Sequence, residues 1–484
     1  MAHKVIELQP LYDPVNPKRG EDKERHGFDL YSIPLLRRVL LWKHSRTVFQ
    51  LILLVAAAGV IFDGFFGRPQ SPRNFATVAS WIDYRFLLVL VILLVGNLFC
   101  MSCPFVLVSH GIQKRVGLNR NWPRWLKGKW LALGLLVLIL FSYEQFSIWD
   151  SPFLTATVCV LYFASAVLTD FIFKGNSFCK YVCPLGLFNQ TYSMLSPTEV
   201  KSKSFAFCKS CTTKECVKGD ATHHQEGCQM SLYMGTKQSN IDCTYQMSCA
   251  RACPYHNVGL EFRNPIRELW TNIKKRDFSL GAVALVLCFA SLTNAGSMIG
   301  PFQDFQRTIG NVTGLTNNFW SYTLIFLFFA LALPAFFGWL TTWLTQKMAR
   351  TSEPLSAIFK RYAVGLLPLS FSFWLAHYAF HFIVGGGGVW PTIQDMFERL
   401  GFPILGKPAW GNPGLLPYSV IFPLQLIVIY GGFMASGVAI YQISRKMYKK
   451  RVARTAMLPF MVLALVLAIA AVLIMAQPMQ ARGT

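Results

Sequence analysis

Residues 243–254 have the sequence CTYQMSCARACP, which places Cys243, Cys249 and Cys253 directly ahead of Pro254. Four further cysteines precede this stretch, at Cys208, Cys211, Cys216 and Cys228. Seven of the 13 cysteines of the chain therefore lie between residues 208 and 253. Clustered cysteines at such short spacings are typical of metal ligation rather than of a disulfide framework.

The last cysteines are close to the run C-x2-C-x2-C-x3-C-P of bacterial two-cluster ferredoxins. In that pattern three thiolates of one run bind one iron–sulfur cluster and the fourth reaches to the other cluster. By this rule one cluster would be held by Cys208, Cys211, Cys216 and Cys253, and the second by Cys228, Cys243 and Cys249. The alternative is a structural zinc site, because paired cysteines also bind zinc.

Gln246 occupies the position of the missing cysteine in this run. A site with three thiolates can hold a 3Fe-4S cluster, a 4Fe-4S cluster with a non-thiolate fourth ligand, or no stable cluster. The sequence therefore predicts 4Fe-4S chemistry in the insertion, with one cluster as a candidate for the 3Fe-4S type.

The composition of the whole chain is that of a membrane protein. Of its 484 residues, 53% are hydrophobic and only 14% are charged, a balance outside the range of soluble globular domains. The net charge of +23 does not indicate nucleic-acid binding, because Lys and Arg also collect in the cytoplasmic loops of membrane proteins. We therefore expect a lipid bilayer as a partner and no nucleic acid.

Apolar segments long enough to span a bilayer occur at nine places. They are predicted at residues 48–64, 86–106, 130–148, 152–173, 278–298, 319–344, 363–384, 416–443 and 458–477. With the N-terminus inside, the inner segments carry 39 of the 46 Lys and Arg residues, which is the bias that sets membrane orientation. The fold class predicted is a mainly α polytopic membrane bundle of about nine helices, N-in and C-out, with an inserted cytoplasmic ferredoxin-like α+β iron–sulfur module.

Four parts follow from this map. Residues 1–47 form a basic N-terminal segment, in which the pattern near Leu35–Lys43 predicts an amphipathic helix on the membrane surface. Residues 48–197 form a four-helix membrane domain, residues 198–277 the iron–sulfur domain, and residues 278–484 a five-helix C-terminal membrane domain. A short helix is also expected between Pro391 and Leu400.

Two more cysteine pairs lie at the cytoplasmic ends of predicted membrane helices, each followed by a proline. They are Cys100 and Cys103 before Pro104, and Cys179 and Cys183 before Pro184. Four thiolates at one membrane depth predict a further cluster site or two redox-active dithiols. The alternative is two unrelated buried pairs, since a free cysteine behaves as a small hydrophobe.

His377 and His381 lie one helical turn apart in the seventh predicted span. Ionisable side chains inside a membrane are functional candidates, so these two could bind a quinone head group, a metal or a haem iron. Hydrogen bonding between helices is the structural alternative.

Taken together, two membrane C-x(2–3)-C-P motifs followed by a ferredoxin-type segment resemble the NapH/NosR/CcoG group of membrane-bound polyferredoxins. The resemblance covers about residues 28–277, including Gly96 to Cys100 and Phe178 to Pro184. It implies iron–sulfur ligation by the four membrane cysteines and the seven insertion cysteines.

The resemblance also implies a function in the bacterial inner membrane. It indicates an electron-transfer component that passes electrons between cytoplasmic or quinone donors and a membrane or periplasmic acceptor. Lysines of the insertion, such as Lys209 and Lys214, suggest a dock for an acidic donor of the ferredoxin kind. A redox assembly or regulatory factor, such as a metal-ion reductase or a sensor for a copper enzyme, is the alternative.

Overall fold

The computed structural model describes residues 27–222, 224–271, 273, 276–315 and 318–479. The fold is mainly helical, as the sequence predicts. Within the described residues, eight helices are long and apolar enough to cross a membrane. These helices occupy Ser45–Phe66, Phe75–Leu94, Pro152–Ile172, Phe278–Gly296, Phe319–Ala349, Leu355–Arg399, Tyr418–Met447 and Lys450–Met475. A multi-pass membrane protein follows from this set.

The third predicted span, residues 130–148, is a shorter apolar helix. Helix α7 (Trp130–Gln145) has 16 residues, which at 1.5 Å per residue gives a length of about 24 Å. This length is below the roughly 30 Å of a hydrocarbon core. It ends at Gln145 because Ser147 takes a left-handed conformation before the next helix begins.

The second span lies earlier in the chain than predicted. It runs over Phe75–Leu94 rather than residues 86–106, and includes the π-helical turn η3 (Val78–Asp83) and α4 (Tyr84–Leu94). The chain then turns at Gly96, whose φ of +102° favours glycine. Cys100 consequently lies on the short helix α5 (Leu98–Met101), and Cys103 caps α6 (Pro104–Val116).

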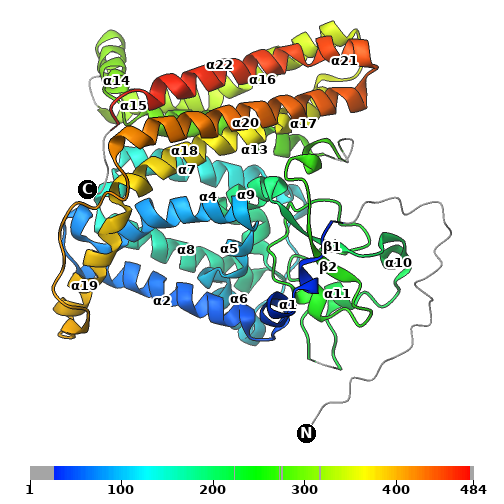
Figure 1. The fold of residues 1–484 in the computed structure, drawn as a ribbon, viewed down its shortest axis with the longest axis horizontal. Coiled ribbons are helices and arrows are strands. Elements are labelled where there is room, and N and C mark those ends of the chain that lie inside the picture. Colours follow the sequence, from blue (N-terminus) through cyan, green and yellow to red (C-terminus); the bar gives the residue numbers. More distant parts are fainter. Residues whose placement is uncertain (1–26, 223, 272, 274–275, 316–317, 480–484) are drawn as a thin grey trace.

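Figure 1 shows two layers of helices. Helices α2 (Ser45–Phe66), α6 and α8 (Pro152–Ile172) pack side by side in the N-terminal layer, and α4 belongs to the same layer because α3 (Phe75–Thr77), at the start of its span, packs on α2 and α8. The second layer contains α13 (Phe278–Gly296), α16 (Leu333–Ala349), α18 (Leu367–Gly385), α20 (Tyr418–Met447) and α22 (Leu458–Met475). Helix α18 joins the layers, because it packs on α13 and α20 and also contacts α4.

Two smaller predicted helices are present. The amphipathic N-terminal segment contains α1 (Pro34–Leu41), with Leu35 and Val39 exposed; residues 1–26 lie outside the described part of the chain. Helix α19 (Val389–Arg399) matches the expected helix after the glycine run. Its Arg399 pairs with the fully buried Asp63 of α2, so this carboxylate lies inside the protein rather than in lipid.

The cysteine-rich segment lies at one end of the helical layers (Figure 1). Strand β1 (Thr198–Ser202) pairs antiparallel with β2 (Val258–Phe262), in a register that sets Val200 opposite Leu260. Between the strands are α10 (Phe205–Ser210), α11 (Glu215–Lys218) and α12 (Ser248–Arg251), joined by loops. These loops contain seven of the ten non-glycine residues with positive φ in the described chain.

Buried polar contacts attach this segment to the helices. The Asn97 side chain donates to the Cys243 carbonyl at 2.9 Å. Arg263 pairs with Glu268 and donates to the carbonyls of Ser193 and Met194, each at 3.1 Å. The position of the cysteines relative to the membrane helices is therefore fixed by hydrogen bonds as well as by apolar packing.

Candidate functional site

Three neighbouring cysteines and a fourth from much later in the sequence line one pocket of the cysteine-rich segment. This group, called thiol group A, consists of Cys208, Cys211, Cys216 and Cys253. Cys208 and Cys216 lie on α10 and α11, and Cys253 follows α12. The pocket thus brings together the four residues that the crossover rule assigns to one cluster.

Polar groups of the chain contact the sulfurs of group A. The Asn257 amide donates to Cys208 Sγ at 3.2 Å. Backbone amides at Asn257 and Tyr255 contact Cys253, a pattern that favours the thiolate. Burial is nevertheless the larger effect, and it raises the pKa of the Cys208 thiol to about 11.

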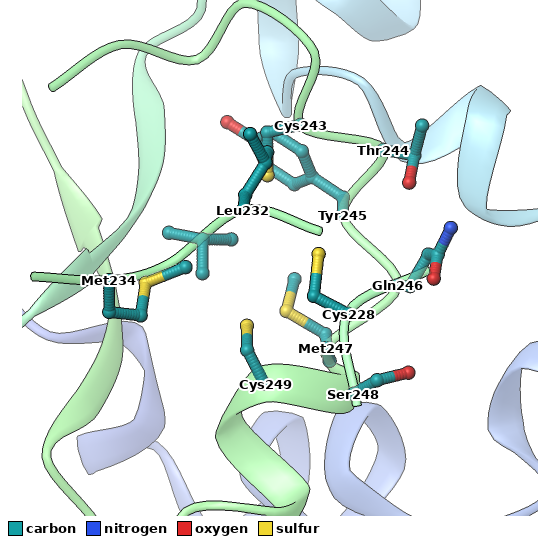
Figure 2. Close-up of a pocket in the computed structure, with 11 residues that line it drawn as sticks. Cys228, Leu232, Met234, Cys243, Thr244, Tyr245, Gln246, Met247, Ser248 and Cys249 are labelled. Carbon is teal, nitrogen blue, oxygen red and sulfur yellow. The ribbon is translucent and has the colours of Figure 1, made fainter. Parts of the chain in front are cut away.

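Thiol group B consists of Cys228, Cys243 and Cys249, which line a second pocket together with Gln246. Figure 2 shows the three thiols facing one space, with the thioethers of Met234 and Met247 beside it. The Tyr31 hydroxyl contacts Met247 Sδ at 3.1 Å, so an N-terminal residue supports the wall of the site from behind. These are the three cysteines that the sequence assigns to the second cluster.

Gln246 does not take the place of a fourth ligand in this arrangement. Its side chain points away from the three thiols in Figure 2. Only 6% of Gln246 is exposed, and neither amide atom has a hydrogen-bond partner among the residues that the structure describes. The positive φ values of Tyr245 and Met247 on either side explain how the backbone turns this buried side chain away from the thiols.

Thiol group C consists of the two membrane-end pairs, Cys100, Cys103, Cys179 and Cys183. Cys103, Cys179 and Cys183 belong to one packed cluster with Phe178 and Met230. Burial, followed by the proximity of Cys103, Cys183, Asp170 and Cys100, raises the pKa of the Cys179 thiol well above its usual value. The structure thus brings both pairs together, as the matching membrane depth predicts.

Local structure explains how group C is formed. Cys179 lies in the π-helical turn η6 (Phe178–Val182), and π-helical turns are frequent at functional sites. Cys103 and Cys183 each precede a proline that begins a helix, so nearby backbone amides are free of helical partners. One of them, at Gly186, donates to Cys183 Sγ at 3.1 Å.

The three groups follow one another without an interruption. Met234 lines the pockets of both A and B. The Cys228 amide of group B donates to the Cys216 carbonyl of group A at 2.9 Å. Cys228 also packs against the cluster that contains Cys103, Cys179 and Cys183 of group C. Group B therefore lies between group A and group C.

Several polar residues of the site were not predicted from the sequence. Arg46, at the start of α2, donates to the Gln229 side chain at 2.9 Å and to the Met101 carbonyl at 3.4 Å. Asn189 donates to Cys100 Sγ at 3.6 Å. Asn97, which donates to the Cys243 carbonyl, could have been proposed from the sequence because it stands three residues before Cys100. Arg46 and Asn189 do not stand next to a cysteine motif, so no pattern in the sequence is a reason to select them.

The two candidate histidines lie outside the thiol groups. His377 and His381 of α18 are almost fully buried, with ring centroids 4.9 Å apart. His381 lines a small pocket with Trp81 and Tyr143. Cys159 and Cys288 are likewise separate from the three groups, so they offer matched controls for changes at the other cysteines.

In the described part of the chain, no group of three or more His, Cys, Asp or Glu side chains is arranged to hold a single metal ion. No protein-family model matches the chain, and comparisons with curated proteins and with solved structures gave no significant similarity. The resemblance to the membrane-bound polyferredoxins therefore stays a prediction based on the cysteine motifs.

Proposed function

We propose that this membrane protein transfers electrons through iron–sulfur clusters held by thiol groups A, B and C. The observation that carries the proposal is the continuous arrangement of eleven cysteines from three sequence regions in three adjoining groups. Packing alone gives no reason for cysteines to be gathered in this way. Bound iron–sulfur clusters would supply one-electron redox chemistry at each group.

The donor sets fit such clusters. Groups A and C each offer four thiols, the number that a 4Fe-4S cluster needs, and group B offers three. A ferredoxin-like module is consistent with β1 and β2 closing the segment and with the crossover of Cys253 to group A. With Gln246 turned away, group B fits the 3Fe-4S type or a cluster with another fourth ligand.

Residues around the thiols would tune the sites. The N–H donors of Gly186, Asn257 and Asn189 stabilise charge on the cysteine sulfurs. The guanidinium of Arg46 lies close to Cys179 and Cys103 and offsets negative charge at group C. Apolar side chains such as Met234 and Phe178 limit access of water.

The positive-inside bias supports an orientation with groups A and B on the cytoplasmic side of a bacterial inner membrane. Lys203, Lys209 and Lys214 are exposed on this segment, which suits an acidic ferredoxin-like donor. Docking of this kind becomes weaker as ionic strength rises.

Anaerobic redox titration tests the proposal. Protein purified without oxygen should bleach in the visible range on addition of dithionite and develop electron paramagnetic resonance signals of reduced clusters. The Cys288→Ala variant should behave identically, because Cys288 packs in the core away from all three groups. Protein that carries no redox-active signal in either state would refute the proposed function.

A further inference from the structure

A cavity of about 260 Å³ lies between the membrane helices of the N-terminal layer and α18. Its wall is mostly aliphatic and aromatic, and includes Ala57 of α2, Val158 of α8 and Tyr378 of α18. An apolar cavity of about 150 Å³ already holds a benzene ring, so this one has room for a substituted six-membered ring. A mostly apolar lining with a few polar groups is typical of a small-molecule site.

The cavity contains one arginine, which is held by aromatic rings. The Arg85 guanidinium lies 4.0 Å from the ring centre of Tyr143, 4.8 Å from that of Trp81 and 5.0 Å from that of Tyr378. Its one hydrogen bond to a side chain in the described part of the chain goes to the Tyr143 hydroxyl, at 3.0 Å. A guanidinium has five N–H donors, so Arg85 retains donors for a ligand.

The backbone beside Arg85 is irregular. Trp81 lies in the π-helical turn η3, directly before α4. Such a turn leaves the regular hydrogen-bond ladder and is frequent at functional sites. Trp81 is therefore presented to the cavity from a distorted part of a membrane helix, and Arg85 follows it one turn later in α4.

The same cavity reaches the helix ends that carry group C. Pro104 and Pro184, which follow Cys103 and Cys183, both line it. The ring of Tyr84, next to Arg85 in the chain, lies 4.7 Å from that of Phe99, which precedes Cys100. A molecule in the cavity would thus contact Arg85 and also the residues that adjoin Cys100, Cys103 and Cys183 in the chain.

We propose that this cavity binds the ring of a lipid-soluble quinone, with Arg85 donating to a ring carbonyl. A quinone combines the two features that the wall requires, an apolar ring for the aromatic side chains and a carbonyl oxygen for the guanidinium. Binding stands on the cavity alone, whereas a redox role for the bound quinone rests on the proposed function. This site differs from the histidine pair expected from the sequence, because neither His377 nor His381 lines the cavity.

The test uses purified protein in detergent and a short-chain quinone that carries a photoreactive azide. Labelling should be saturable, should map to peptides of α2 or α8, and should be blocked by the unlabelled quinone but not by a fatty acid. Arg85→Leu should weaken binding about tenfold or more, since it removes a hydrogen bond from a charged donor. Ala57→Phe, which fills the cavity and keeps the cation, should weaken binding as well.

His377→Leu is the matched control, because it removes a buried polar side chain of α18 that does not contact the cavity. Loss of labelling in His377→Leu but not in Arg85→Leu or Ala57→Phe would overturn the proposal in favour of the histidines. Equal competition by a fatty acid would show that the cavity is filled by a lipid tail, and the absence of saturable labelling would also overturn it.

Iron and sulfide are measured on the same samples. Saturable labelling of protein without iron would support the cavity and refute the proposed function. Iron-containing protein without saturable labelling would support the proposed function and refute quinone binding in the cavity.

Discussion

The crossover of Cys253 to thiol group A leads to a prediction about iron content. In the sequence Cys253 stands beside Cys249, yet it lines the pocket of Cys208, Cys211 and Cys216. Cys249 lines the other pocket, with Cys228 and Cys243. Replacing cysteines by alanine in pairs therefore tests the spatial grouping against the order in the sequence.

The magnitudes follow from the number of thiols in each group. Groups A and C would each hold about four irons, and group B about three or four, so the chain would hold about eleven or twelve. Cys208→Ala and Cys253→Ala should each remove about four irons, and the double variant should remove no more than either single change. Cys249→Ala with Cys253→Ala should remove about seven or eight, because two groups are lost.

The assay is the determination of iron and acid-labile sulfide per chain after anaerobic purification. Cys159→Ala and Cys288→Ala serve as controls and should keep the full iron content, because neither residue belongs to a thiol group. The crossover would be refuted if the double variant Cys208→Ala/Cys253→Ala lost about twice as much iron as either single variant, while Cys249→Ala/Cys253→Ala lost no more iron than either of its single variants.

Three further predictions concern charged residues. Arg263→Met should lower the free energy of unfolding by about 3–5 kcal/mol in chemical denaturation, because it leaves the buried Glu268 without its partner; a loss below 1 kcal/mol would contradict this. Burial alone would raise the pKa of Glu199, but Lys237 and Arg263 bring this pKa below its usual value of 4.5. The stabilisation that the Glu199 carboxylate contributes is therefore present above about pH 4.5, and it is lost as the pH falls through the lower pKa of the folded protein. Glu199→Gln should therefore make thermal stability fall less steeply below about pH 4.5, and an unchanged acid profile would exclude the effect. Arg46→Met should shift the reduction potential of the cluster at group C to a more negative value in a redox titration, whereas Arg46→Lys, which keeps the charge, should shift it less.

The hydropathy of the chain predicts the membrane helices well, since eight of the nine expected spans correspond to helices of sufficient length. It misplaces the second span, because an apolar run that continues to Phe105 conceals the turn at Gly96. A Cβ atom at position 96 would collide with Ser196 and Tyr245, which lie about 100 or more positions further along the chain, so only glycine fits this turn. No local pattern in the sequence contains these contacts.

The sequence likewise predicts one part of the candidate site and not the other. The grouping of the cysteines was predictable, because motif spacing encodes the crossover. The cavity beside Arg85 was not, since its wall combines residues from α2, α4, α7, α8 and α18. Arg85 itself gave no signal, because it stands at the predicted start of a span, where an arginine is ordinary.

The most direct test of the account is the iron, sulfide and zinc content of the anaerobically purified protein, together with its low-temperature electron paramagnetic resonance spectrum. The account predicts about eleven or twelve irons per chain, an approximately equal amount of sulfide, and signals from reduced clusters. Colourless protein that contains zinc, or no metal at all, would contradict it.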